Sequence, residues 1–387
     1  MHMSKHDFPE TEFRDRQERT RQAIAGAGLD WLLVINPVSL HWLIGSETKG
    51  YTSFQCLPLS AAPGRLVMFA RETDRNELED DTLVDEVRGW NGAEPEDPIE
   101  AFERLARELG LGNARVGMEV PSWYLHPHHY LRIKAMLGDA LVAEPSTLIL
   151  DLKLVKSPRE LTYVRRSAEI AGKALDALLA GVAEGRSELE LAAAAFHTLL
   201  AAGSGLPAST MNLVTGERCS TVLGAPTQRR LRRGDPGHVE VAAAHRRYTS
   251  TLGRVWSLGA PSRRLRELHE VVGRASDACI ATIRSGVPTT VPHEAAKQVF
   301  VDAGLDRYRQ HTTGYGIAPG FPPSWGEPVN MFGGNSYTLR AGMVVSVEPN
   351  LFIHEERLGV RIIDNVLVTE AGCELLSSRP RELVVIE

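Results

Sequence analysis

The first part of the chain alternates short apolar runs with amphipathic stretches. Residues 31–35 read Trp-Leu-Leu-Val-Ile and stop at Asn-Pro, which predicts a buried strand. Residues 98–109 have helical spacing, and the apolar run at 114–120 predicts another strand. Residues 146–152 are expected to form the last strand of this region. The alternation of strands and helices predicts an α/β domain over residues 1–154.

A strong helix start opens a second domain. Ser157-Pro158-Arg159-Glu160 combines a capping box with a proline at the first helical position. Apolar residues then recur at helical spacing as far as residue 181. We therefore place the domain junction near Leu154, so that residues 155–387 form the second domain.

The second domain repeats one order of elements. A long helix, a second helix and strand-rich sequence follow one another between residues 157 and 256, and again between residues 261 and 368. The second long helix is expected to run from Ser262 to Gly286. The repeat predicts two α-α-β-β halves around a pseudo-twofold axis. Because Glu240 and Glu348 occupy equivalent places in the two halves, their carboxylates should face each other across this axis.

The composition is that of an ordinary globular protein. The 387 residues carry 43 basic and 49 acidic side chains, a formal net charge of -6, and 43% of them are hydrophobic. This balance argues against nucleic acid or anionic lipid as a partner, because both need clustered Lys and Arg. No apolar run is long enough to predict a membrane span, and the charged start does not resemble a signal peptide. Four scattered cysteines fit a reducing compartment, so we expect a cytoplasmic protein.

Paired carboxylates favour chemistry on a compound rich in N–H groups. Glu348 lies in a run of valines and Glu240 in a similar apolar strand, where an unpartnered carboxylate is costly unless it has a function. Two facing carboxylates can bind planar N–H groups, and their repulsion raises one pKa so that a proton stays available. Hydrolysis of an amidine or guanidine needs both functions. The sequence leaves open whether Glu240 attacks carbon directly or activates water.

Other side chains complete the predicted site. Tyr315, between two glycines, could donate to a developing tetrahedral centre, and His238 and His311 are candidate proton carriers. The loop that holds Trp325 and Glu327 is expected to supply a substrate wall and a polar anchor. Further expected substrate contacts are Tyr51, Phe54, Thr251, Arg254 and Arg361. The two arginines have a structural alternative, which is pairing with the central carboxylates or with Asp364.

Four segments resemble the landmarks of the creatinase, aminopeptidase P, prolidase and methionine aminopeptidase superfamily. They are Val155-Lys156-Ser157-Pro158-Arg159-Glu160-Leu161, Gly314-Tyr315-Gly316-Ile317, Glu348-Pro349 and Val360-Arg361-Ile362-Ile363-Asp364. The resemblance covers almost the whole chain. It implies an α+β pita-bread catalytic domain preceded by an α/β N-terminal domain. It also implies a homodimer in which the N-terminal domain of the partner closes the site.

The resemblance also bears on metals. The peptidases of the superfamily bind two metal ions through two Asp, one His and two Glu. Carried over residue by residue, these ligands fall on Glu240, Thr251, Tyr315, Glu348 and Ile363. Thr, Tyr and Ile do not replace Asp, His and Glu as ligands of hard divalent cations. We therefore expect no metal site and no cofactor.

Within the superfamily, local features resemble ectoine hydrolase and creatinase, which split C–N bonds in small cyclic amidine or guanidino compounds. These features are Gly216–Thr221, Arg246-Arg247-Tyr248, Pro322–Glu327 and the Glu at position 240. The chain departs from the pattern at Val222-Leu223-Gly224, which lacks a His, and at Gly253, which replaces an acidic residue of creatinase. We therefore expect a metal-independent C–N hydrolase of a small molecule. The alternatives are an Xaa-Pro dipeptidase or aminopeptidase, and a pita-bread binding protein that has lost its activity.

Overall fold

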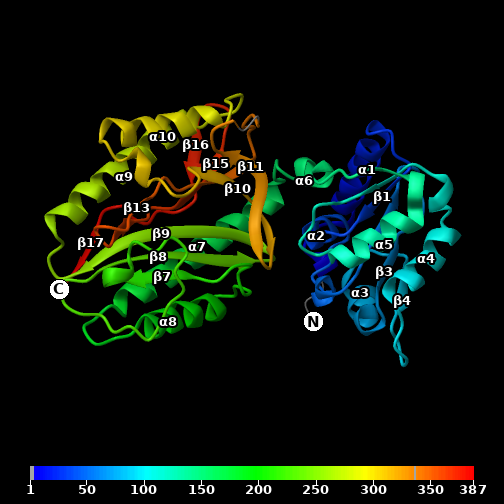
Figure 1. Ribbon diagram of the computed structural model, residues 1–387, viewed down its shortest axis with the longest axis horizontal. Coiled ribbons are helices and arrows are strands. Elements are labelled where there is room, and N and C mark those ends of the chain that lie inside the picture. Colours follow the sequence, from blue (N-terminus) through cyan, green and yellow to red (C-terminus); the bar gives the residue numbers. More distant parts are fainter. Residues whose placement is uncertain (1–3, 335–336) are drawn as a thin grey trace. The chain divides into compact units, whose positions relative to one another are not determined.

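A computed structural model describes residues 4–334 and 337–387, and the chain divides into two compact units (Figure 1). Met1–Lys153 forms the N-terminal unit and Leu154–Glu387 the C-terminal unit. In the part of the chain that the structure describes, no helix is both long enough and apolar enough to cross a membrane.

The N-terminal unit is an α/β domain, as the alternating pattern predicts. Its main sheet has the order β2-β1-β5-β6, with β1 antiparallel to β2 and parallel to β5, and β3 pairs separately with β4. Neighbouring residues of β1 point to opposite faces of the sheet, so Leu32 and Leu33 belong to two different apolar cores. The elements are α1 (Glu10–Gly26), β1 (Trp31–Val34), α2 (Pro37–Ile44), β2 (Leu57–Ser60), β3 (Val67–Arg71), α3 (Arg75–Asp81), β4 (Glu86–Trp90), α4 (Pro98–Glu108), β5 (Val116–Met118), α5 (Pro127–Leu137), β6 (Leu141–Ala143) and α6 (Leu148–Leu152).

The prediction of a strand at residues 146–152 is wrong. Leu148–Leu152 forms the short helix α6, in which only Ile149 is buried, and the last strand of the unit is β6. A short apolar run fits a buried strand and one turn of a helix equally well, so its periodicity does not decide between them.

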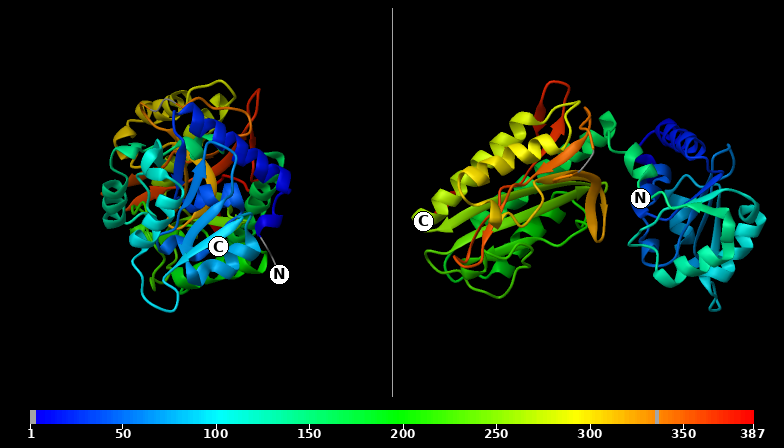
Figure 2. Two further views of the ribbon diagram at one scale, coloured as in Figure 1. Left: turned by 90° about the vertical axis from the view of Figure 1, so that its right-hand side faces the viewer. Right: turned by 45° about the horizontal axis from the view of Figure 1, so that its top comes forward.

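The C-terminal unit has the predicted pita-bread architecture. One sheet has the order β16-β15-β12-β10-β9-β8-β7, with β11 added beside β10 and β17 beside β9. Helices α7 and α8 flank one half and helices α9 and α10 the other, as Figures 1 and 2 show. The elements are α7 (Pro158–Ala180), α8 (Glu188–Ala201), β7 (Asn212–Thr215), β8 (Pro236–His245), β9 (Tyr248–Leu258), α9 (Arg263–Thr282), α10 (Thr290–Asp302), β10 (Gly314–Phe321), β11 (Ser324–Met331), β12 (Val344–Val347), β13 (Leu351–Ile353), β14 (Leu358–Val360), β15 (Asp364–Val368), β16 (Cys373–Leu375) and β17 (Val384–Ile386).

Capping boxes fix the starts of α7 and α8, the first two helices of the C-terminal unit. Ser157 Oγ accepts the Glu160 N–H at 3.2 Å, and the Glu160 carboxylate accepts the Ser157 N–H at 2.7 Å. Ser187 and Glu190 repeat the same arrangement at the start of α8. Ser262 caps α9 by accepting the N–H of the residue three positions later. Each cap satisfies N–H groups that the first turn of a helix leaves without a partner.

Helix α9 ends at Thr282, which is earlier than predicted. The N–H groups of Ser285 and Gly286 donate to the carbonyl oxygens of Thr369 and Leu339 instead of continuing the helix. These non-local partners are not visible in the local sequence, which explains the difference.

Each half of the unit has its own apolar core. Helices α7 and α8 pack with β7, β8 and β9, whereas α9 and α10 pack with strands of the second half. Glu240 lies within β8, and Glu348 directly follows β12. The fold therefore brings the two carboxylates from the two halves toward one space.

Candidate active site

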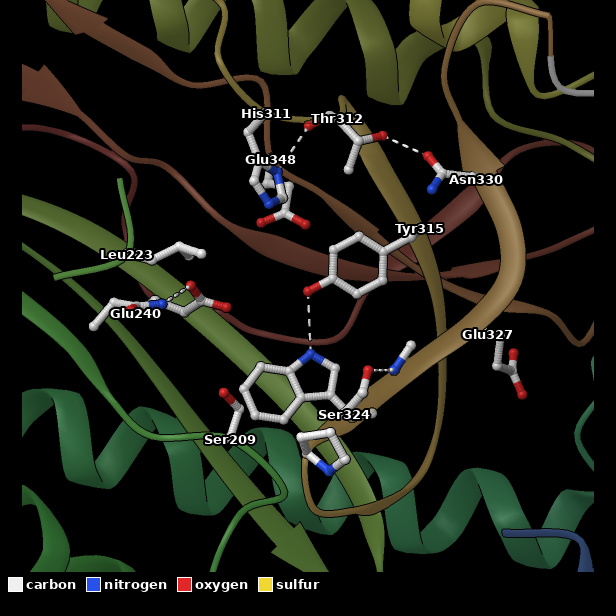
Figure 3. A pocket seen from close by; sticks show the side chains of 14 residues that line it. Ser209, Leu223, Glu240, His311, Thr312, Tyr315, Ser324, Glu327, Asn330 and Glu348 are labelled. Atoms are coloured by element: carbon white, nitrogen blue, oxygen red, sulfur yellow. Dashed lines mark hydrogen bonds between the residues drawn. The ribbon is translucent and has the colours of Figure 1, made fainter. Parts of the chain in front are cut away.

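A pocket of about 340 Å³ lies where the two halves of the C-terminal unit meet (Figure 3). This volume is at the lower end of the range of small-ligand pockets, about 300–1,000 Å³. The pocket is lined by Ser209, Asn212, Leu223, Glu240, His311, Thr312, Tyr315, Pro323, Ser324, Trp325, Gly326, Glu327, Asn330 and Glu348. Six of these residues are among the candidates that the sequence predicts.

Glu240 enters the pocket from the middle of β8. Its Oε2 accepts hydrogen bonds from Asn212 Nδ2 at 2.8 Å and from Arg361 Nη1 at 3.0 Å. Arg361 is buried, does not line the pocket, and also donates to the Val222 carbonyl. One cation and one amide therefore hold Glu240, and its second oxygen points toward the pocket (Figure 3). Arg361 positions the carboxylate, as the structural alternative from the sequence states, and does not contact the substrate space.

Glu348 faces Glu240 across the pocket. Its backbone N–H donates to the Thr313 carbonyl at 2.8 Å, and its side chain is buried. Among the described residues, no group donates a hydrogen bond to Glu348 Oε1. Burial and the nearby charge of Glu240 raise the pKa of the Glu348 carboxyl well above its usual value, and the charge of Arg361 only partly opposes this. The Glu348 carboxyl therefore favours its protonated form.

Tyr315 lies beside both carboxyl groups (Figure 3). Its hydroxyl oxygen accepts a hydrogen bond from Trp325 Nε1 at 3.1 Å. Burial and the charges of Glu348 and Glu240 raise the pKa of Tyr315 well above its usual value. The phenol therefore keeps its proton and can donate it in a hydrogen bond to a group inside the pocket.

His311 is a basic group in the pocket wall. Its Nδ1 lies 3.2 Å from the Thr312 carbonyl, and since a carbonyl only accepts, Nδ1 carries the proton and Nε2 is the acceptor. Burial is the main cause that lowers the pKa of His311. The ring centroid lies 6.5 Å from that of Tyr315. The neutral imidazole is therefore suited to accept an N–H group or a proton.

The structure places His238, the other predicted proton carrier, outside the pocket lining. His238 is fully buried, its Nε2 lies 2.9 Å from the Cys219 carbonyl, and its ring packs against Phe352. Burial lowers the pKa of His238 to about 3, so it stays neutral at ordinary pH. Its contact holds the start of the segment that carries Leu223, which is a structural role.

Glu327 lines the pocket but is not the free polar anchor that the sequence predicts. Its Oε2 lies 2.5 Å from Lys156 Nζ, and both side chains are 1% exposed. Lys156 also donates to the Leu154 carbonyl at 3.2 Å. The carboxylate is therefore committed to an ion pair behind the wall, whereas Trp325, two residues earlier on β11, contributes the predicted wall.

Two predicted substrate contacts on β9 lie away from the pocket. The Thr251 N–H donates to Asn365 Oδ1 at 2.6 Å, and Thr251 Oγ1 accepts from Asn365 Nδ2 at 2.9 Å. Arg254 pairs with Asp364 at 2.8 Å and donates to several carbonyl groups. Both side chains are buried in structural contacts, which corrects their assignment as substrate contacts.

Two further predicted contacts belong to the N-terminal unit. Phe54 is buried in the apolar core of that unit, where it packs edge-to-face on Phe102 at 5.5 Å, so it is not the substrate contact that the sequence predicts. Tyr51 is partly exposed and packs edge-to-face on Tyr124 at 5.8 Å.

Sequence reasoning did not place several of the side chains that surround the carboxyl pair. Asn212 lies directly opposite Glu240 in the β7–β8 ladder, so a strand pairing of residues 212–215 with the Glu240 strand would have found it. No local signal distinguishes the others, because they come from loops or strand ends. They are Ser209, Leu223, Thr312, Ser324 and Asn330.

The positions at which the resemblance places metal ligands do not present a complete ligand set. Glu240 and Glu348 supply carboxyl groups, but Thr251 is hydrogen-bonded away from the pocket and Ile363 is a buried apolar side chain. Tyr315 supplies a protonated phenol. Glu240 Oε2 already accepts a hydrogen bond from the Arg361 guanidinium. These residues do not fit a centre of two divalent cations, which needs several anionic or imidazole donors around each ion.

Comparisons with protein families match both units. The model of metallopeptidase family M24 matches residues 162–370, and that of the creatinase/prolidase N-terminal domain matches residues 16–155. The ectoine hydrolase of Halomonas elongata is 25% identical over 401 residues, covering 98% of each chain. The Xaa-Pro dipeptidase of Pyrococcus horikoshii is 28% identical over 291 residues, covering 74% of this chain and 80% of that protein.

A solved structure agrees with these matches. Dipeptidase PepE from Mycobacterium ulcerans superimposes with a TM-score of 0.86 at 26% identity, covering 98% of this chain and 99% of that chain. The prolidase of Thermococcus sibiricus has a TM-score of 0.87 at 23% identity, covering 98% of this chain and 100% of that chain, which supports the fold.

Proposed function

We propose that this chain, which belongs to metallopeptidase family M24 and has a creatinase/prolidase N-terminal domain, is a metal-independent hydrolase. Its proposed reaction is cleavage of a C–N bond in a small amidine, guanidino or related compound. The carboxyl pair of the pocket carries the proposal. Glu240 is held by Arg361 and Asn212, whereas Glu348 is protonated and has an acceptor oxygen without a partner among the described residues. This arrangement supports a base, Glu240, and an acid, Glu348, on two sides of one small pocket.

The donor chemistry supports metal independence. Three of the five ligand positions carry side chains that are poor ligands for divalent cations, and a guanidinium holds one of the two remaining carboxylates. The similarity to an ectoine hydrolase along nearly the whole chain agrees with this choice, since ectoine is a cyclic amidine. The dipeptidase similarity is comparable in identity, so the metal content decides between the two classes.

The two carboxyl groups can complete hydrolysis without another cofactor. Glu240 takes a proton from water as the water oxygen bonds to the amidine carbon, and Tyr315 donates a hydrogen bond to the developing tetrahedral centre. Glu348 then gives its proton to the leaving nitrogen, the C–N bond breaks, and the new C–OH group returns a proton to Glu348. The proton that Glu240 holds leaves with the amine product, so both residues return to their starting states.

Metal content is the first test. We expect purified protein to contain no stoichiometric manganese, cobalt or zinc by mass spectrometry, and expect chelators to leave turnover unchanged. The screen for turnover should cover cyclic amidines, guanidino compounds and Xaa-Pro dipeptides. Metal that is required for turnover of a dipeptide would overturn the proposal.

A control is needed because a metal can bind elsewhere. Among the described residues, Asp7, His41 and Glu47 of the N-terminal unit are the one group of three whose potential ligand atoms all lie within 4.8 Å of one another. Metal analysis should therefore be repeated on His41→Asn. If this variant loses its metal and keeps its turnover, the metal is bound in the N-terminal unit and takes no part in the reaction.

Replacement of Arg361 tests the positioning of Glu240. Arg361→Met should lower kcat/KM by up to about 10²-fold, because a misplaced catalytic group loses its near-attack geometry. The charge of Arg361 lowers the pKa of Glu348, so its removal raises that pKa further and should shift the basic limb of the pH profile to higher pH. Arg361→Lys keeps the charge and should restore the position of that limb, but not the full rate. An unchanged limb in Arg361→Met would contradict the assignment of Glu348 as the acid.

A further inference from the structure

Glu188, the first residue of α8, is a fully buried carboxylate to which the proposed mechanism gives no role. Its Oε1 accepts hydrogen bonds from the N–H of Thr215 at 2.8 Å and from the Thr215 hydroxyl at 2.9 Å. Its Oε2 accepts from the N–H and the hydroxyl of Thr227 at 2.9 and 2.7 Å, and also from Arg218 Nη1. These donors offset the cost of burying the charge, and they lie 27 to 39 positions further along the chain.

The donors bracket a loop, residues 216–226, which we call the pocket loop. Thr215 ends β7 directly before the loop, and Thr227 directly follows it. Arg218, inside the loop, also donates to the Ala225 carbonyl at 2.8 Å, so it ties the start of the loop to its end. Because Glu188 bonds to both ends of the loop and to Arg218, this one carboxylate holds the loop closed.

The pocket loop reaches the carboxyl pair through Arg361. The Val222 carbonyl accepts a hydrogen bond from Arg361 Nη2, while Arg361 Nη1 donates to Glu240 Oε2 at 3.0 Å. Among the described residues, Arg361 Nε has no acceptor, so the two Nη contacts orient the guanidinium. Leu223, the next residue of the loop, lines the pocket beside Glu240 (Figure 3). The position of Glu240 therefore depends on where the loop places the Val222 carbonyl.

A close backbone contact seats the pocket loop against its neighbours. A Cβ atom at Gly359, in β14, would lie 2.0 Å from the Cys219 carbonyl oxygen, so this approach requires glycine. The same carbonyl lies 2.9 Å from His238 Nε2. Since β14 ends one residue before Arg361 and His238 lies on the strand of Glu240, the loop packs against both segments that it helps to position.

On the basis of the proposed function, we infer that Glu188 is a positioning residue of the active site. It is not among the described residues that line the pocket, and it acts through its hydrogen bonds to the pocket loop. Glu188 fixes the loop, the loop fixes the Arg361 guanidinium, and Arg361 holds Glu240 in place as the base.

Kinetics of a matched pair of variants test this role, on the substrate that turns over fastest in the screen of cyclic amidines, guanidino compounds and Xaa-Pro dipeptides. Glu188→Gln should lower kcat/KM by at least about tenfold, mostly through kcat, because a shifted loop moves Glu240 out of its near-attack position. Glu190→Gln is the control, since Glu190 accepts the Ser187 N–H at 2.7 Å in the capping box of the same helix. It should lower the stability but leave kcat/KM within about twofold. Equal losses of kcat/KM in the two variants would overturn the inference.

The route through Arg361 has its own test. In an Arg361→Met background, Glu188→Gln should lower kcat/KM by less than about threefold, because the contact through which it acts is already lost. A loss of about tenfold in both backgrounds would overturn this route.

Amide hydrogen exchange, followed by mass spectrometry on the full chain, gives a readout that needs no substrate. Glu188→Gln should speed exchange by at least about tenfold in peptides that cover residues 215–227 and 358–364, whereas Glu190→Gln should leave both unchanged. Thr227→Val removes one hydroxyl that donates to Glu188 and keeps the shape of the side chain, so it replaces Glu188→Gln if that variant fails to fold. Unchanged exchange of residues 215–227 in Thr227→Val would overturn the inference.

Exchange and turnover fail independently. If the wild type hydrolyses no amidine or guanidine, the proposed function is overturned, and faster exchange in both segments would still support the link from Glu188 to Arg361. If the wild type hydrolyses such a compound and Glu188→Gln changes neither exchange nor kcat/KM, the inference is overturned and the proposed function stands.

Discussion

Replacing Glu348 by glutamine is expected to lower kcat/KM by about 10²–10⁴-fold, because an amide cannot pass a proton to the leaving nitrogen. The fold should be retained, since glutamine has nearly the same shape. Glu370→Gln, at an exposed carboxylate of the same unit, is the control and should leave the rate unchanged. A Glu348→Gln variant that retains wild-type turnover would contradict the assignment of the acid.

The same variant should reveal the buried proton through the pH dependence of stability. The folded protein keeps the Glu348 proton at pH values where the unfolded chain, with a pKa of about 4.3, has lost it. The free energy of unfolding of the wild type should therefore fall as pH rises from about 4.3 through the raised pKa, by up to about 1.4 kcal/mol per pH unit. Glu348→Gln has no such proton to lose, so its advantage over the wild type should grow with pH.

Urea unfolding at several pH values between 5 and 8 would measure this difference. Curves for the two proteins that run parallel over this interval would mean that Glu348 is ionised in the folded state. Glutamine can stabilise the protein while it removes turnover, so the two readouts separate a functional carboxyl group from a structural one.

The carboxyl pair was predictable because strong local signals define the elements that carry it. The capping boxes at Ser157 and Ser187 fix the starts of two helices, and the repeated order of elements then relates Glu240 to Glu348. An acidic residue in an apolar strand is itself a signal, because burial of a carboxyl group is costly unless the site uses it.

The surroundings of the pair were not predictable, because they depend on contacts between distant segments. Glu327 looks like a substrate anchor in its loop, but its partner Lys156 is 171 positions away in the sequence. Arg254 and Thr251 look like site residues near the predicted active strand, yet both are committed to contacts with β15. Leu223 lies in a segment that departs from the family pattern, but nothing in the local sequence predicts that its side chain lines the pocket.

Loss of the Lys156 ammonium is the change expected to destabilise the protein most. Lys156 and Glu327 form an ion pair with 2.5 Å between Nζ and Oε2, and water reaches about 1% of each side chain. Lys156→Met leaves the Glu327 carboxylate buried without this cation, which should cost about 3–5 kcal/mol of unfolding free energy. This cost arises mainly from the Glu327 carboxylate, which stays buried after its cation is removed, since methionine fills a volume similar to that of lysine.

An exposed lysine provides the matched control. Lys297 pairs with Glu294 at 3.4 Å, with side-chain exposures of 36% and 58%, so Lys297→Met should cost no more than about 1 kcal/mol. Urea unfolding of both variants would measure the contrast. Equal costs for the two substitutions would mean that the Lys156–Glu327 pair contributes no more than a surface pair.

A double replacement separates the charge from the packing. Lys156→Met combined with Glu327→Gln removes both charges and should recover part of the stability that Lys156→Met loses, because no buried carboxylate is left without its cation. Glu327 lies two residues from Trp325 on β11, so the single variant should also raise KM by displacing this wall, whereas kcat should change less because neither residue belongs to the carboxyl pair. Recovery of both stability and KM in the double variant would mean that the Lys156–Glu327 ion pair supports the pocket wall. Recovery of neither would mean that the two side chains act through packing alone.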